Sequence, residues 1–206
     1  METEKTVQDG KITNEELGTL QRKLDEVKLR TKKGLPLPLV LNKLQQLIET
    51  SFKITPKPFD LSMLGDGWEE LEGEKDKRSA NLQEVDLLKV KFVSCLETGE
   101  ALIKGEEKLC RLKESGDVLH GSALFMALWE DYQEKKENSL LEQLYQTGLI
   151  KGYLDFPGNV FRSPDGRRCV LYFARDSADG WRWLAFWLER GWRVGDLSVV
   201  SPAIVS

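Results

Sequence analysis

The sequence predicts an α+β protein in which an N-terminal helical hairpin and central helices precede an antiparallel β-meander packed on helices. Over the first two-thirds of the chain, apolar residues recur at spacings of three and four, as in amphipathic helices. From about residue 150 the pattern changes to alternation, and turn sequences with glycine, proline and aspartate separate the apolar runs. Hydrophobic residues make up 40% of the 206 residues and charged residues 31%, which is enough apolar material for a core.

Residues 1–56 are expected to form the helical hairpin. Thr13 and Glu16 have the spacing of a capping box, and Gly34 with the prolines that follow it ends the first helix. A second helix is expected from about residue 39 to residue 50. Short helices are marginal alone, so we expect the hairpin to dock on the rest of the protein or to pair with a second copy.

Residues 57–80 are expected to form a connector, because they contain a proline-rich stretch, a glycine turn and a charged segment. The α+β domain then covers 81–206, with its sheet starting at about residue 150. In this domain an apolar stripe from Leu82 to Leu96 predicts one helix, and further helices are expected at 106–113, 123–136 and from Leu140 to Gly148. The single histidine, His120, precedes the helix at 123 and is expected to be a cap or surface residue without a catalytic role.

The last part of the chain is expected to contain five strands, at 150–156, 159–162, 167–174, 180–188 and 197–200. The turn Ser163-Pro-Asp-Gly166 between two of them is strongly indicated, because proline presets the first turn angle and glycine accepts the last. Strands separated by such short turns predict an antiparallel meander.

Composition and motifs exclude several classes of function. The net charge of −4 is inconsistent with a globally basic nucleic-acid-binding protein. No catalytic triad, Cys-His pair or phosphate-binding loop is recognisable, so we expect no enzyme activity, no cofactor and no metal site. The three scattered cysteines suit a reducing compartment, and we find neither a signal peptide nor an apolar run that could span a bilayer. These features predict a cytoplasmic protein.

The segment from Trp181 to Leu188 carries most of the functional information. Alternation in a strand places two sets of side chains on opposite faces, namely Trp181, Trp183, Ala185 and Trp187 against Arg182, Leu184, Phe186 and Leu188. We expect the tryptophans to pack against the helix at 123–136. The second face is either another buried layer or an exposed apolar strip with an arginine rim of Arg182, Arg190 and Arg193, which is the composition of a binding site.

Several motifs resemble those of known proteins. Thr98-Gly-Glu, Lys104-Gly-Glu-Glu-Lys, Leu128-Trp-Glu and Val160-Phe-Arg-Ser-Pro-Asp-Gly, followed by the tryptophan-punctuated tail, resemble uncharacterised proteins of small-genome bacteria. The tail resembles the variable region of proteins targeted by diversity-generating retroelements. In that family a reverse transcriptase rewrites adenines, and the resulting NNC codons cannot encode Trp, Glu, Lys, Gln or Met. Consistent with this, no Lys, Gln or Met follows Asn159.

The resemblance implies a C-type-lectin-like C-terminal domain that displays variable side chains to a ligand. The residues that we nominate for binding are Arg182, Leu184, Ala185, Phe186, Arg190, Arg193, Val194 and Asp196. A calcium site is not implied, because the paired cysteines and the Glu-Pro-Asn motif of animal lectins are absent.

We therefore expect a non-enzymatic protein whose tail binds a protein or another macromolecule, with a homo-oligomer formed through the N-terminal helices. Two alternatives stay open. Arginine and tryptophan in the tail could bind single-stranded nucleic acid, although eight basic against six acidic residues from Lys151 onward form a weak electrostatic footprint. The chain could also be a purely structural interaction subunit.

Overall fold

The structure is a computed structural model that describes residues 25, 28, 36, 52–176 and 179–203. The chain divides into two compact units, Met1–Ser51 and Phe52–Ser206. The expected N-terminal hairpin lies outside the described residues except at three positions, so the following description concerns the second unit.

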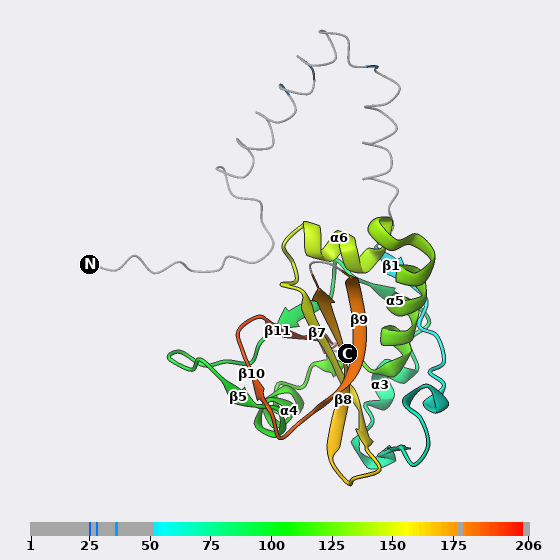
Figure 1. Ribbon diagram of the computed structural model, residues 1–206. Coiled ribbons are helices and arrows are strands. Elements are labelled where there is room, and N and C mark those ends of the chain that lie inside the picture. The colour runs from blue at the N-terminus through cyan, green and yellow to red at the C-terminus, as the bar shows by residue number, and fades with distance from the viewer. Residues whose placement is uncertain (1–24, 26–27, 29–35, 37–51, 177–178, 204–206) are drawn as a thin grey trace, which may run out of the picture. The chain divides into compact units, whose positions relative to one another are not determined.

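A seven-stranded sheet forms the centre of this unit (Figure 1). Its strands are β2 (Glu69–Glu70), β4 (Lys91–Val93), β6 (Val118–Leu119), β7 (Tyr153–Arg162), β8 (Arg168–Asp176), β9 (Gly180–Trp187) and β11 (Asp196–Ser201). The main path runs in the order β4-β11-β7-β8-β9, while β2 pairs with β7 and β6 pairs with β11. Two small ribbons pair β1 (Lys53–Ile54) with β3 (Val85–Asp86) and β5 (Ile103–Lys104) with β10 (Gly191–Trp192).

The α+β class is confirmed, and most of the expected strands are present. The strands expected at 150–156 and 159–162 are one continuous strand, β7, with an irregular register between Phe156 and Phe161. Strands β7, β8 and β9 form the expected antiparallel meander. The expectation is wrong for the last strand, because β11 pairs with β7 in parallel. Local turns specify hairpins, whereas the place at which a later strand enters the sheet depends on long-range packing.

The helices α4 (Gly105–Glu114), α5 (Ser122–Lys135) and α6 (Leu140–Gln146) lie where the apolar periodicity predicts them. The helix expected between Leu82 and Leu96 is absent, since this stretch contains β3, a turn and β4. Val85 and Leu87 are buried where β3 pairs with β1, Phe92 is half-buried on β4, which pairs with β11, and Leu88 in the turn between them is exposed. The spacing of apolar residues alone cannot distinguish a helix from strands in such a short stretch.

The stretch expected as a connector packs on the sheet. Strand β2 pairs with β7, and the ring of Phe59 lies 6.0 Å from Phe125 and 5.7 Å from Phe161. The same stretch contains the short helix α3 (Lys77–Ala80) and two 3₁₀ helices, Leu61–Leu64 and Glu72–Glu74, and a third 3₁₀ helix, Lys136–Asn138, follows α5. Residues 57–80 are therefore part of the folded unit.

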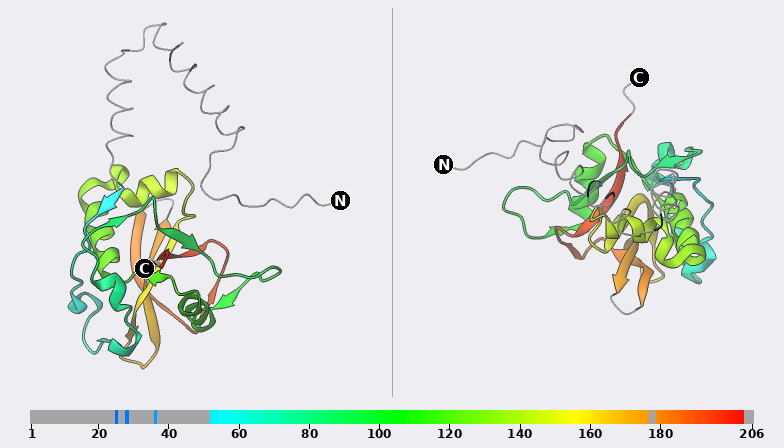
Figure 2. Two further views of the ribbon diagram at one scale, coloured as in Figure 1. Left: turned by 180° about the vertical axis from the view of Figure 1, so that it is seen from behind. Right: turned by 90° about the horizontal axis from the view of Figure 1, so that it is seen from above.

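Helices cover both faces of the sheet (Figures 1 and 2). We call the side under α5 and α6 the α5 face, where Phe125, Leu141 and Phe173 belong to one buried cluster. We call the opposite side the α4 face, where Leu109 and Tyr172 belong to a second cluster. Among the described residues, no helix has the length and apolar character needed to cross a bilayer.

Candidate functional site

A groove of about 1000 Å³ lies on the α4 face, beside the β5–β10 ribbon. Five of the nominated residues line it, namely Phe186, Arg190, Arg193, Val194 and Asp196. Leu102 and Lys104 from the β5 side, Tyr153 and Tyr172 from the sheet, and Glu189 complete most of its wall. The fold thus brings the end of β9 and the turn before β11 together with five residues that we had not nominated from the sequence.

The floor of the groove is a row of aromatic rings across three strands. Tyr172 on β8 stacks between Tyr153 on β7, at 5.9 Å, and Phe186 on β9, at 5.0 Å. Trp192 meets Phe186 edge-on at 5.0 Å. Because side chains alternate along a strand, these three strands direct their rings to the same face. The row gives the groove an apolar base that is already packed.

Asp196 holds the turn that forms one wall. Its Oδ1 accepts a hydrogen bond from the hydroxyl of Tyr172 at 2.9 Å, and its Oδ2 accepts one from the backbone N–H of Arg193 at 2.6 Å. Burial and the neighbouring Asp196 carboxylate raise the pKa of Tyr172, so the phenol stays protonated and can donate. Asp196 therefore acts as a positioning residue, with both carboxylate oxygens engaged inside the protein.

Three basic side chains surround the aromatic floor. Lys104 Nζ donates to the carbonyl oxygen of Glu189 at 3.0 Å, and the guanidinium of Arg190 lies 4.6 Å from the Trp187 ring. Over the described part of the chain, none of Lys104, Arg190 and Arg193 forms an ion pair with a carboxylate. These cations are accordingly free to form charge-assisted hydrogen bonds with an anionic group of a ligand.

The other three nominated residues lie on β9 outside the groove. Arg182 is exposed, and Leu184 and Ala185 are half-buried. Leu184 packs against the cluster on the α4 face, so it belongs partly to a structural layer. The structure therefore separates the nominated set into a groove group and a group on strand β9.

The expected packing of tryptophans against α5 is confirmed for Trp183, whose ring lies 5.7 Å from that of Phe125. The Trp181 ring is buried in the same cluster but lies against Tyr145 of α6, at 6.2 Å, and its backbone N–H donates to the Tyr132 hydroxyl of α5 at 3.0 Å. The expectation is wrong for Trp187, whose ring contacts the guanidinium groups of Arg167, at 3.5 Å, and Arg190, at 4.6 Å. Trp187 lies at the end of β9, where Arg167 and Arg190 cover its ring.

A buried ion pair lies beneath the groove. Lys108 Nζ is 2.7 Å from Asp155 Oδ2 and also donates to the carbonyl oxygen of Asp196 at 2.7 Å, while Ser198 donates to Asp155. Burial raises the pKa of Asp155, and the charge of Lys108 opposes that shift. Sequence reasoning missed this pair, although a lysine one position before Leu109 on the apolar side of α4 was a usable signal.

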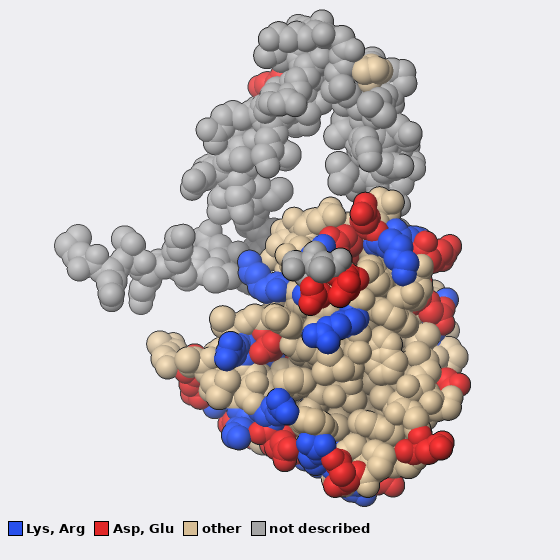
Figure 3. Space-filling view, in the orientation of Figure 1, with Lys and Arg blue, Asp and Glu red and all other residues tan. Residues whose placement is uncertain are grey.

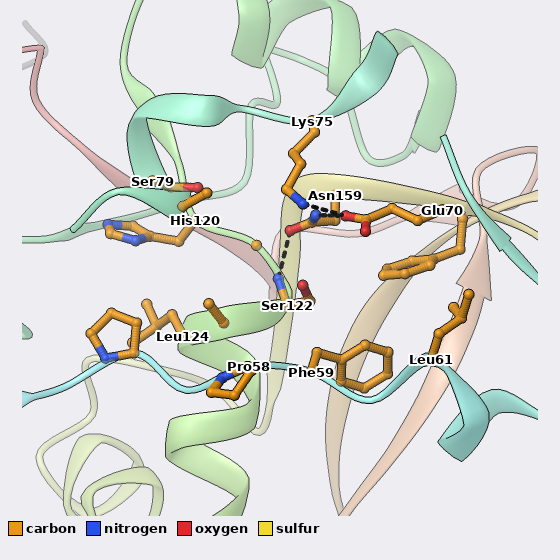
Figure 4. Close-up of a pocket in the computed structure, with 15 residues that line it drawn as sticks. Pro58, Phe59, Leu61, Glu70, Lys75, Ser79, His120, Ser122, Leu124 and Asn159 are labelled. Carbon is orange, nitrogen blue, oxygen red and sulfur yellow. Dashed lines mark hydrogen bonds and ion pairs between the residues drawn. The ribbon is translucent and has the colours of Figure 1, made fainter. Parts of the chain in front are cut away.

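A smaller cavity of about 290 Å³ lies between residues 56–61 and the start of α5 (Figure 4). Asn159 joins its walls, because its Oδ1 accepts from the Ser122 backbone N–H at 2.7 Å and its Nδ2 donates to Glu70 (Figure 4). Lys75 in turn pairs with Glu70 at 3.3 Å. Since Asn159, Glu70 and Lys75 bond to one another or to the backbone, the arrangement fastens the segment before α3 to the sheet.

The expectation of a cap or surface position for His120 is wrong, because the residue is 1% exposed. Its Nε2 is 2.7 Å from the Ser201 hydroxyl, a contact across 81 positions that sequence reasoning missed. Burial lowers the pKa of His120 to about 4, so the imidazole is neutral at physiological pH. Such a weak base is poorly matched to activating a serine at neutral pH, and no carboxylate within the described ranges forms a hydrogen bond with the imidazole.

No group of three or more potential metal ligands occurs among the residues that the structure describes. Comparison of the chain with protein-family models, curated proteins and solved structures finds no match. The groove, with its aromatic floor and free cations, is the feature of the described unit that best fits ligand binding.

Proposed function

We propose that the chain is a non-enzymatic binding protein that holds a protein ligand in the groove on the α4 face. The observation that carries the proposal is the combination of a packed aromatic floor and three basic side chains that form no ion pair with any carboxylate in the described part of the chain. Apolar side chains at the margin, Leu102 at 51% and Val194 at 72% exposure, add contact surface. A ligand segment with acidic groups and an apolar anchor would complement both features.

Single-stranded nucleic acid fits the groove less well. Bases bind by stacking on exposed aromatic faces, and Tyr172 is stacked by Tyr153 on one side and by Phe186 on the other. We therefore keep nucleic acid as the second outcome of the test.

We further propose that the side chains around the groove vary, as the resemblance to retroelement target proteins implies. Support comes from a contrast within the tail. Among the tail residues that NNC codons cannot encode, Trp181 and Trp192 are 3% and 1% exposed, Trp183 and Trp187 are half-buried, and Glu189 is exposed, whereas Arg190 and Arg193 are both exposed. Variation at exposed positions would change the groove and spare the core. A C-type-lectin-like relationship, a homo-oligomer through the N-terminal helices and a cytoplasmic location stay predictions.

The groove is tested with a displayed library of random peptides panned against the full chain. We expect the enriched peptides to combine acidic and apolar residues, and to lose binding to a triple variant with Arg190→Ala, Arg193→Ala and Val194→Ala. Lys77→Ala, which removes an exposed cation outside the groove, is the matched control and should bind as the parent does.

Two results would contradict the groove assignment. One is enrichment of peptides that bind the triple variant equally well, and the other is tight retention of a single-stranded oligonucleotide with a steep dependence on salt. The proposal of variation has its own test in the DNA around the gene. A near-copy of the tail-coding segment that differs mainly at adenines supports it, and the absence of such a copy refutes variation while leaving the groove assignment intact.

A further inference from the structure

We propose that strand β9 is a self-pairing edge through which two copies of the chain form an antiparallel dimer. This inference goes beyond the groove, because it concerns the outer edge of the sheet and a second copy of the same protein.

Strand β9 occupies one end of the main path and pairs with β8 alone on that path. Leu188, just past the strand, donates its backbone N–H to the Arg168 carbonyl oxygen at 2.9 Å. In an antiparallel ladder, alternate residues direct N–H and C=O to the same neighbour. Even-numbered residues of β9 therefore face β8, and the odd-numbered ones, Trp181, Trp183, Ala185 and Trp187, direct their backbone groups outward.

Two contacts agree with this assignment and delimit the open part of the edge. The outward N–H of Trp181 donates to the Tyr132 hydroxyl, and the outward carbonyl of Trp187 accepts from the Arg190 N–H at 3.0 Å. Among the described residues, no such hydrogen bond reaches the outward groups of Trp183 and Ala185. The open edge is thus centred on Leu184, between these two residues.

The open part of the edge lacks several of the features by which proteins usually prevent strand pairing. Its register with β8 is continuous from Gly180 to Trp187, without a bulge, and the strand contains no proline, no lysine and one charged residue, Arg182. Figure 3 shows a broad area without charged side chains beside α5 and over the lower part of β9, while a basic group lies over the upper part of that strand. A strand of this kind is a template for pairing with another strand.

A second copy is the occupant that the strand itself favours. If two β9 strands meet antiparallel with Leu184 at the two-fold axis, Trp183 of each copy pairs with Ala185 of the other. The outward N–H and C=O groups of Trp183 in one copy then form hydrogen bonds with those of Ala185 in the other, and the large indole lies opposite the small methyl group. Arg182 falls opposite Phe186 of the second copy, where a cation–π contact can form, and the two arginines do not face each other.

Neighbouring registers fit less well. With Trp183 on the axis, Ala185 would meet Trp181, whose N–H is already bonded to Tyr132. With Ala185 on the axis, Trp183 would meet Trp187, whose carbonyl is already bonded to Arg190. The register centred on Leu184 pairs the open residues with each other.

Cysteine cross-linking tests this register in the full chain, with the exposed Cys110 replaced by Ser. In Leu184→Cys the two thiols would face each other as a non-hydrogen-bonded pair, with Cα atoms about 4.5 Å apart, so we expect a disulfide-linked dimer under mild oxidation. Arg182→Cys is the matched control and should stay uncross-linked. The double variant with Arg182→Cys and Phe186→Cys should cross-link again. Failure of Leu184→Cys to cross-link, or equal cross-linking of Arg182→Cys alone, would overturn the proposal.

Mass measurement by light scattering over a range of concentrations gives a second, independent test. We expect the parent chain to form dimers, and Ala185→Pro to shift the mass to that of a monomer. The N–H lost at position 185 points away from β8, so the thermal unfolding of this variant should stay close to that of the parent. Dimers that persist in Ala185→Pro would show that the copies pair elsewhere. A parent that is monomeric throughout would also overturn the proposal, and neither result bears on peptide binding in the groove.

Discussion

The two faces of the central sheet differ in how completely they are covered, although the same strands build both. On the α5 face, Phe125 packs among Phe156 and Phe173, and all three rings are fully buried. On the α4 face, Tyr172 is buried but its stacking partner Phe186 is only half-buried, beside an open groove. Alternation decides which side chains share a face, whereas the helices and ribbons that pack on that face decide whether it is closed.

The faces also differ in their polar content. Beneath the groove, Lys108 and Asp155 form an ion pair in which both side chains are almost completely buried. On the α5 face, the nearest equivalent is Glu142, which binds Arg175 at 2.8 Å and the Trp181 indole at 3.0 Å near the margin. The buried layer on the α4 face is therefore stabilised partly by a charge pair, whereas the layer on the α5 face is stabilised mainly by aromatic packing.

Loss of the buried lysine should have the largest effect. Lys108→Met leaves the Asp155 carboxylate without its partner, and we expect the free energy of unfolding to fall by about 3–5 kcal/mol. Urea unfolding measures this change. Lys104→Met, an exposed lysine at the start of the same helix, is the control and should shift the value by less than about 0.5 kcal/mol. Equal effects of the two substitutions would mean that the ion pair does not hold the α4 face.

Truncation of one phenylalanine on each face compares the two directly. Phe125→Ala removes a fully buried ring, and we expect a loss of about 3–5 kcal/mol in urea unfolding. Phe186→Ala removes a half-buried ring from the groove, and we expect a loss of about 1 kcal/mol. Should Phe186→Ala prove as costly as Phe125→Ala, the groove floor would be core and the contrast between the faces would disappear.

The pH dependence of stability should reveal the buried histidine at the start of α5. Burial lowers the pKa of His120 from 6.5 to about 4, so between these values the unfolded chain binds a proton that the folded chain does not. The contribution of His120 to the free energy of unfolding is complete above pH 6.5. It is lost as the pH drops towards 4, by about 3 kcal/mol in total. Unfolding curves at several pH values measure the loss. In His120→Gln this component should vanish, and an unchanged dependence in that variant would assign it to other groups.

The smallest effect is expected at the rim of the groove. Arg193 is exposed and has no acidic partner for its guanidinium over the described part of the chain, so Arg193→Ala should change the free energy of unfolding by less than about 0.5 kcal/mol. Thermal unfolding would detect a larger change. A substantial loss would indicate that the rim contributes to the fold, and would weaken the case that this position can vary freely.

The sequence was sufficient to predict much of the sheet and part of the candidate site. Strands β7, β8 and β9 and the side chains on each face of β9 follow from alternation and turn residues, both of which are local. Alternation and turn residues also allowed us to assign Arg190 and Arg193 to the rim of a binding face from the sequence. Tyr153, Tyr172 and Lys104 were missed, because their contribution depends on the neighbours that the fold brings beside them.

By itself, the sequence determined the positions of α4, α5 and α6, to within one or two residues at each end, and the hairpins of the meander, since apolar periodicity and turns act between residues close in the chain. Only the tertiary structure decided the parallel entry of β11, the burial of His120 and the pairing of Lys108 with Asp155. The ion pair spans 47 positions and the His120 contact spans 81. Contacts of that range form only when a whole layer packs, so the sequence near Lys108 can mark it as a buried lysine but cannot name Asp155 as its partner.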